Sequence, residues 1–185
     1  MSDAIIKATQ HWLTEMVIGQ NFCPFAQKPF TQGAIRYHVN ASQDWANIQQ
    51  DFTQQLHFLN THNNVDTTLF IVDWANLDFY DYLDGLMLLE QSLENSGFEG
   101  VFQIASFHPD YQFEGEAASS PSHYTNRSPL PIYHILREDS LSQVLDNMPY
   151  AHTIPEDNVA RAQRLGKAFF EQILTQARAQ LPDER

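Results

Sequence analysis

Two apolar runs, of eight and seven residues, place the strongest constraint on the fold of this chain. The segment "TTLFIVDW" at 67–74 is typical of a strand that helices cover on both faces of a sheet, and "VFQIASF" at 101–107 predicts another apolar strand. Both are far too short to cross a membrane as helices. Between them, apolar residues of the segment 78–96 recur every three or four positions, which predicts an amphipathic helix. This alternation of strand and helix predicts an α/β fold.

The rest of the chain continues the alternation without a repeat or a linker, so we expect one domain over residues 1–185. "AIRYHVN" at 34–40 and "PIYHILRE" at 131–138 predict two further strands. We therefore expect three layers, with a largely parallel or mixed sheet of about four strands flanked by helices. We expect a first helix over 3–18 that Gly19 stops, a second from a cap at Ser42 to about 59, and a third from Asp78 to a stop at Gly97. A short helix is expected over 139–146. One long helix is expected from Pro155 to about 177, followed by a frayed tail at 181–185.

The charge distribution excludes some partners. The net charge is −13, and no lysine or arginine occurs between His38 and Asn126. A surface of this kind repels phosphate backbones, so we expect no nucleic acid and no anionic membrane as a partner. The chain starts without a basic stretch followed by an apolar one, and no run approaches the ~18 apolar residues of a membrane helix. These features predict a soluble, cytoplasmic protein.

The segment "FHPDYQFEGE" at 107–116 predicts a functional loop, because it follows an apolar strand and opens about 24 irregular residues. Ligands of open α/β sheets bind beyond the carboxyl ends of strands, where this loop begins. His108 is a candidate acid or base, or a strand-end histidine bonded to the backbone. Tyr111 is a candidate binding residue or a core anchor. Asp110 and Glu114 are candidate metal ligands or solvated carboxylates.

A second cluster, "NRSPLPIYHILRE" at 126–138, combines basic and amide side chains. Arg127 and Arg137 are candidate anion-binding residues, because a guanidinium offers a planar fork to a carboxylate or phosphate. The alternative for each is an ion pair with a neighbouring carboxylate. Asn126 suits a turn beside the binding site. His134 is a second candidate catalytic residue, although its apolar neighbours at alternate positions also fit a histidine of the core.

The single cysteine, Cys23 in "NFCPFA", excludes an internal disulfide and zinc-finger spacing. As a nucleophile it would need a lowered pKa from a nearby histidine or arginine. Otherwise it is a small buried apolar residue.

Three motifs, "CPFA" at 23–26, "ASFHPDYQFEG" at 105–115 and "YTNRSPLPIYHILRE" at 124–138, resemble an uncharacterised bacterial family, domain of unknown function 1415. The similarity extends from the first predicted helix to about Leu145. The resemblance implies a soluble bacterial protein in which Cys23, His108, Arg127, His134 and Arg137 occupy positions of family motifs. It implies no activity and no cofactor.

Three functions fit these observations. The first is an enzyme acting on a small anionic metabolite, with His108, His134 and Cys23 as catalytic residues and Arg127, Arg137, Tyr111 and Asn126 as binding residues. The second is a non-enzymatic interaction module with aromatic anchors at Trp74, Phe79, Tyr80 and Tyr111. The third is a zinc hydrolase with ligands from His108, Asp110, His134 and Cys23. No Walker A, GxGxxG or GxSxG motif points to a particular cofactor or nucleophile, and the oligomeric state is open.

Overall fold

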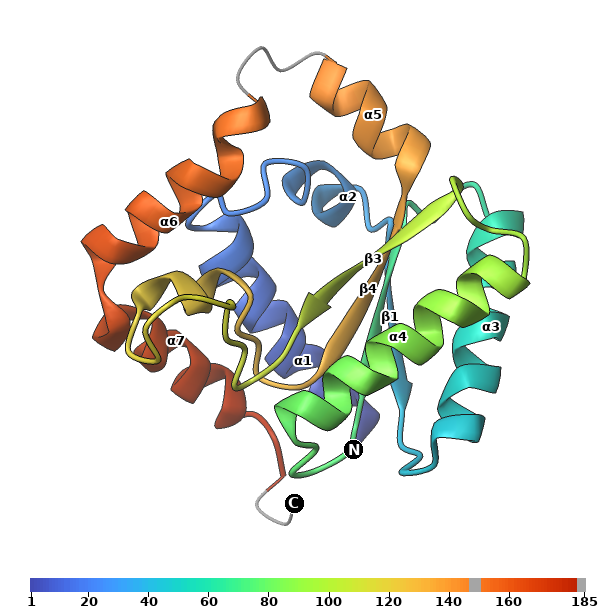
Figure 1. Cartoon of the computed structure of the whole chain (residues 1–185), viewed down its shortest axis with the longest axis horizontal. Helices are drawn as coiled ribbons and strands as arrows, with labels where there is room; N and C mark the ends of the chain where they lie inside the picture. The colour runs from blue at the N-terminus through green and yellow to red at the C-terminus, as the bar shows by residue number, and fades with distance from the viewer. Residues whose placement is uncertain (147–150, 183–185) are drawn as a thin grey trace.

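The computed structural model describes residues 1–146 and 151–182 and has a sheet of four strands between two layers of helices (Figure 1). The strands are β1 (Ile35–Asn40), β2 (Thr67–Val72), β3 (Phe102–Phe107) and β4 (Ile132–Arg137), in the order β1-β2-β4-β3. β1 and β2 are parallel, whereas β4 is antiparallel to both β2 and β3. The expected fold class is therefore confirmed, and the sheet is of the mixed kind.

The two apolar runs of the sequence form the central strand β2 and the edge strand β3, in which only Phe102 is buried. All six residues of β2 are buried. β4 alternates as expected: Ile132 packs into one core and Tyr133 and Ile135 into the other. His134 lies opposite Leu69 of β2 and Ala105 of β3, on the same face as Ile132.

One face of the sheet is covered by α3 (Trp45–Thr61) and α4 (Phe79–Asn95) (Figure 1). Asp78 caps α4 as expected, since its Oδ1 accepts a hydrogen bond from the N–H of Tyr80 at 2.8 Å. The expected cap of α3 is wrong by two residues. Asp44 caps this helix by accepting from Asn47 N–H at 3.0 Å, while Ser42 Oγ accepts from the N–H of Asp44 at 3.1 Å.

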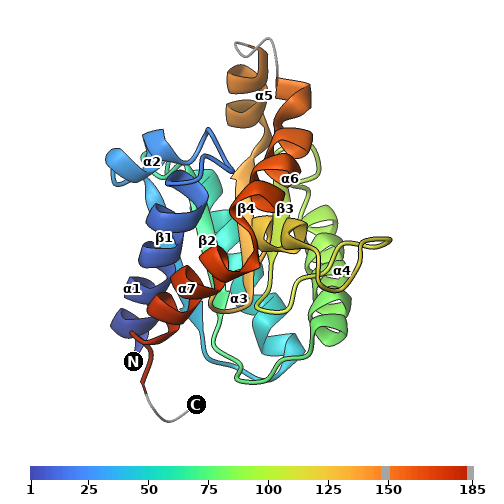
Figure 2. The same cartoon turned by 90° about the vertical axis from the view of Figure 1, so that its left-hand side faces the viewer.

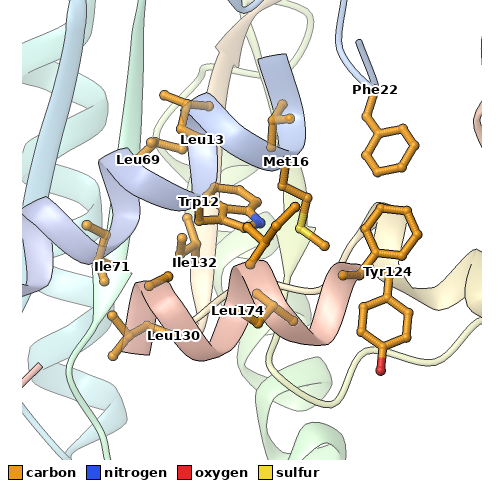
Figure 3. Packing of buried hydrophobic residues seen from close by; sticks show 14 of the residues in the cluster. Trp12, Leu13, Met16, Phe22, Leu69, Ile71, Tyr124, Leu130, Ile132 and Leu174 are labelled. Atoms are coloured by element: carbon orange, nitrogen blue, oxygen red, sulfur yellow. The ribbon is translucent and has the colours of Figure 1, made fainter. Parts of the chain in front are cut away.

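The opposite face is covered by α1 (Ser2–Trp12), its π-helical continuation η1 (Leu13–Ile18), α6 (Ile154–Leu165) and α7 (Lys167–Arg178) (Figure 2). The buried side chains of this layer, including Trp12, Met16, Tyr124 and Leu174, meet those of the sheet in one apolar core (Figure 3). We expected one long helix after Pro155. It is two helices, because Gly166 takes φ 77° and ψ 162°, which interrupts the helical backbone.

Shorter elements connect these layers: α2 (Gln27–Thr31), the 3₁₀ turns η2 (Pro121–Thr125) and η3 (Ala151–Thr153), and α5 (Glu138–Asp146). α2 and η2 lie in segments that we expected to be irregular, whereas α5 was expected. At the carboxyl end, Leu181 packs against the α1–α7 core, and residues 183–185 of the expected frayed tail lie outside the described residues. Within the described part of the chain, no helix is long and apolar enough to cross a membrane.

Candidate functional site

A cavity of about 390 Å³ opens between the turn at 23–29, the sheet and α5. It lies on the α1 side of the sheet, toward the end at which β1 and β2 begin and β4 ends, since Ile35, Thr67 and Leu136 belong to its wall. The charged or reactive side chains of the wall, together with Thr67, are Cys23, Lys28, Asp66, His134 and Arg137, and α5 adds the polar residues Ser140 and Gln143. Three of the residues singled out in the sequence, Cys23, His134 and Arg137, therefore meet here.

Cys23 opens the tight turn that leads into α2. Its side chain is partly buried, and it is a free thiol. Burial raises the pKa of the thiol, and hydrogen bonds from the backbone amides of Phe25 and Ala26 offset only part of this rise. The sulfur therefore stays protonated at neutral pH, with two amide donors already in place for a thiolate.

His134 projects from β4 into the cavity with a defined tautomer. Its Nε2 lies 2.6 Å from Oγ1 of Thr67, and that hydroxyl donates its only proton to the carbonyl of Ile135 at 2.6 Å. Nε2 must then carry a hydrogen and donate to Thr67, which leaves the lone pair on Nδ1. Within the described residues Nδ1 has no hydrogen-bond partner. It is also not one of the fully buried polar atoms that lack a partner, so part of its surface is exposed. A ligand or solvent can therefore reach it.

Burial lowers the pKa of His134 to about 4, so the imidazole is neutral at physiological pH. A neutral imidazole with a free Nδ1 is chemically a base and a hydrogen-bond acceptor. In the same cavity, the thiol of Cys23 is a proton donor.

The formal charge of the cavity wall is positive, in contrast to the whole chain. Lys28 and Arg137 contribute two positive charges against the one carboxylate of Asp66. Arg137 is largely occupied, because its Nε and Nη2 donate to the carbonyl of Val65 and Nη2 also donates to that of Leu59. Arg137 therefore caps the carboxyl end of α3 and also adds positive charge to the cavity. Among the described residues, its Nη1 is the one guanidinium nitrogen that makes no hydrogen bond.

His108 lies elsewhere, at the carboxyl end of β3, and is buried. Its Nε2–H donates to the carbonyl of Leu77 at 3.0 Å, and its Nδ1 accepts from the N–H of Asp110 at 3.1 Å. The ring centroid lies 5.3 Å from that of Phe79 and 4.9 Å from that of Tyr82. Burial lowers the pKa of His108. In this arrangement the histidine joins two loops, and it would have to break a backbone bond to exchange a proton.

The other loop candidates also hold backbone in place. Asn126 donates from Nδ2 to the carbonyl of Ser106 at 3.0 Å. Arg127 donates from Nε to the carbonyl of Tyr111 at 3.2 Å and lies 4.6 Å above the ring of Tyr124. The structure thus separates the candidates into the cavity group and a loop group at the opposite end of the sheet.

Cys23 stands between two cavities, because it also belongs to the wall of a second one of about 510 Å³. This second cavity is bounded by η1, α6 and the 108–131 loop, with apolar contributions from Phe22 and Phe107. Asn126 and Glu114 are among its polar residues. His108 is in the wall of neither, so Cys23 and His108 do not share a cavity.

Comparison with protein-family models gives a single family. The model described as a protein of unknown function, DUF1415, matches residues 4–172. The chain belongs to the DUF1415 family. No curated protein and no solved structure matches the chain.

The three motifs of this DUF1415 chain divide between the two locations. "CPFA" forms the turn at the cavity, and "ASFHPDYQFEG" forms the end of β3 and the aromatic loop. "YTNRSPLPIYHILRE" serves both, because its first half closes the loop while β4 carries His134 and Arg137 to the cavity.

Two residues of the cavity were missed in the sequence. Thr67 sets the tautomer of His134, and Lys28 contributes charge. A threonine beginning a buried strand must find a hydrogen-bond partner, so Thr67 could have been matched with a histidine on an apolar face. Lys28, on a short helix not expected from the sequence, gave no comparable signal.

The geometry gives less support to the other two functions, a zinc hydrolase and a non-enzymatic interaction module. No three His, Cys, Asp or Glu side chains of the described residues come together as metal ligands, so the proposed zinc ligands are not assembled. Of the four aromatic anchors considered for a partner, Trp74 packs on Trp45 with centroids 5.6 Å apart, and Phe79 packs on Tyr111 at 5.2 Å. Tyr80 alone among the four is largely exposed, at 74%.

Proposed function

We propose that the chain is an enzyme in which Cys23 attacks a small anionic substrate bound in the cavity, with His134 as the base. The observation that carries this proposal is the shared wall of Cys23 and His134 in one cavity with Lys28 and Arg137. These residues come from segments that are far apart in the sequence. A nucleophile, a base and positive charge in one enclosed space are the components of covalent catalysis on an anion.

The chemistry starts from an uncharged pair. The sulfur bonds to an electrophilic carbon of the substrate as its proton passes to Nδ1 of His134; the bond from that carbon to the leaving group breaks, and the leaving group takes the proton from the imidazolium. Water, losing a proton to the neutral imidazole, then bonds to the same carbon and displaces the sulfur, which takes the proton back as the thiol. The amides of Phe25 and Ala26 stabilise the sulfur while it is negative. Because the pKa of His134 is low in the free protein, its imidazole holds a proton only weakly. The reaction requires the affinity of the imidazole for a proton to rise when the substrate binds. A substrate anion beside the ring does this by stabilising the imidazolium.

Alkylation of the thiol tests the cavity without knowledge of the substrate. Since Cys23 is the only cysteine, mass spectrometry reports its reaction unambiguously. We expect the ratio of the rates with anionic iodoacetate and neutral iodoacetamide to exceed that of a free thiol such as N-acetylcysteine, because the wall attracts the anion. Lys28→Gln should reduce this ratio, whereas Lys7→Gln, the same charge change on an exposed position of α1, should not.

Variants of the pair then test catalysis. His134→Gln retains a donor toward Thr67 and removes the free ring nitrogen, so alkylation should slow without loss of the fold. A screen of small carboxylates and phosphate esters for turnover should identify a substrate whose conversion Cys23→Ser abolishes. If the ratio of the iodoacetate rate to the iodoacetamide rate is the same in wild-type protein, in Lys28→Gln and in the free thiol, the cavity does not attract anions and this part of the proposal is refuted. Turnover that survives Cys23→Ser would refute the nucleophile.

A further inference from the structure

Two arginines lie at a surface notch outside the Cys23 cavity. The notch, of about 340 Å³, lies between the turn at 109–110, the segment 124–127 and the last two turns of α7. η2 packs on α7 here, as the neighbouring yellow-brown and red segments of Figure 1 show. Arg127 comes from the loop and Arg178 from the end of the helix. The notch shares no wall residue with the Cys23 cavity.

Neither guanidinium is paired with a carboxylate. Within the described residues, the ion pairs shorter than 4.0 Å are His38–Asp51 and Lys167–Glu171. This is unexpected in a chain with 23 acidic and 10 basic residues, since most arginines of such a chain have a carboxylate to contact. Both guanidiniums therefore keep donors that the protein does not use.

The nearest carboxylates do not fill this role. Glu171 is held by Lys167 at 3.2 Å and by the hydroxyl of Tyr124, which donates to it at 3.1 Å. Asp110 borders the notch and makes no ion pair within 4.0 Å in the described part of the chain. Burial is the main cause that lowers the pKa of Arg178. The charge of Asp110 raises this pKa, and the smaller repulsion between the two cations, Arg178 and Arg127, lowers it. An anion between them would relieve that repulsion.

The orientation of Arg127 is fixed before any ligand binds. Its Nε donates to the carbonyl of Tyr111 at 3.2 Å, and its plane lies over the ring of Tyr124, 4.6 Å from the centroid. The structure records no hydrogen bond from either of its terminal nitrogens, nor any from the guanidinium of Arg178, among the described residues. Binding therefore costs little ordering of Arg127.

We propose that Arg127 and Arg178 form a binding site for the phosphate group of a small molecule. The N–H donors of two guanidiniums outnumber the hydrogen bonds that the two oxygens of a carboxylate can accept. A phosphate group on a small molecule has three terminal oxygens, which can accept hydrogen bonds from both guanidiniums. The hydroxyl of Thr175, in the same wall, is a further donor. This site is separate from the Cys23 cavity, and it binds whether or not the cavity is catalytic.

Calorimetric titration with inorganic phosphate and pyrophosphate at low ionic strength tests the proposal. We expect saturable binding that is tighter than that of acetate and weakens with added salt. Arg178→Gln should weaken phosphate binding roughly tenfold or more, as loss of charge-assisted hydrogen bonds does. Arg164→Gln, the same charge change at an exposed position of α6, should leave it within about twofold.

Two further variants keep the test decisive. Arg127→Gln should also weaken binding, but it removes the bond to Tyr111, so Arg178→Gln is the primary variant. Lys28→Gln, which removes a positive charge from the wall of the Cys23 cavity, should leave the binding that Arg178→Gln weakens unchanged, which separates this site from the proposed active site. Absence of saturable binding at millimolar phosphate would overturn the proposal. Equal weakening by Arg164→Gln and Arg178→Gln, or acetate binding as tight as phosphate binding, would overturn it as well.

Discussion

The lowered pKa of His134 makes the free energy of unfolding depend on pH in a calculable way. In the unfolded chain the imidazole titrates near 6.5, and in the folded protein near 4. Below pH 6.5 the unfolded state thus binds more protons, so stability falls as the pH decreases and stops falling below about 4. Linkage between these two values gives a loss of about 1 kcal/mol from pH 7 to pH 5.5.

Urea unfolding at pH 7 and pH 5.5, followed by circular dichroism, measures this loss. The lower pH stays above the sequence pI of about 4.8, where the uncharged protein would aggregate. We expect His134→Gln to lose about 1 kcal/mol less stability than the wild-type protein over this interval. Leu136→Met, a volume-conserving change in the same cavity wall that keeps the imidazole, should behave like the wild type.

The difference between His134→Gln and wild type isolates His134 from other titrating groups, such as His108, whose pKa is also lowered. If both proteins lose the same stability between the two pH values, the imidazole of His134 titrates normally and is not buried as described. The resonance of its ring proton would then titrate near 6.5 in NMR spectra.

Two substitutions test the packing around the site. Gly85→Ala places a methyl group 2.0 Å from Cη2 of Trp45, so we expect a loss of about 1–3 kcal/mol in urea unfolding. In a Trp45→Ala background the same change should cost less, because the hydroxyl of Tyr133, 2.7 Å from the added methyl group, is then the remaining close contact; an equal loss in both backgrounds would refute the clash with Trp45. Arg137→Met removes the donors to the carbonyls of Leu59 and Val65, and unfolding should show a loss of about 1.5–3 kcal/mol. An unchanged midpoint would mean that water replaces these bonds at no cost.

Local patterns in the sequence determined the elements of the fold. The apolar run at 67–74 predicts a strand covered on both faces, and β2 is buried throughout. Asp78 was identified as a cap because its side chain bonds to a neighbour in sequence. The same reasoning failed at Gly166, where an apolar helical spacing continues through a backbone break. Spacing reports which face side chains lie on and is insensitive to a single residue with positive φ.

The candidate residues could be selected from the sequence, but their grouping could not. We expected His108 and the loop that carries Arg127 at one edge of the sheet, and we grouped His134 with them as a candidate catalytic residue, although the direction of its strand was open. His108 lies at the carboxyl end of β3, whereas antiparallel β4 carries His134 and Arg137 toward the opposite end. The direction of β4 depends on its pairing with β2 and β3, which are distant in sequence. The assembly of the Cys23 cavity therefore depends on strand pairing, and no local pattern encodes it.

The sequence alone determined the α/β class, the elements of the sheet, the excess of negative charge and the three motifs that carry the unusual side chains. These depend on interactions between residues that are near in sequence or on composition. Only the tertiary structure decided that Cys23 lines a cavity with His134 and not with His108, that Arg137 caps α3, and that Arg127 lines a notch with Arg178. Each of these arrangements joins segments separated by tens of residues, and the packing of helices on the sheet selects them.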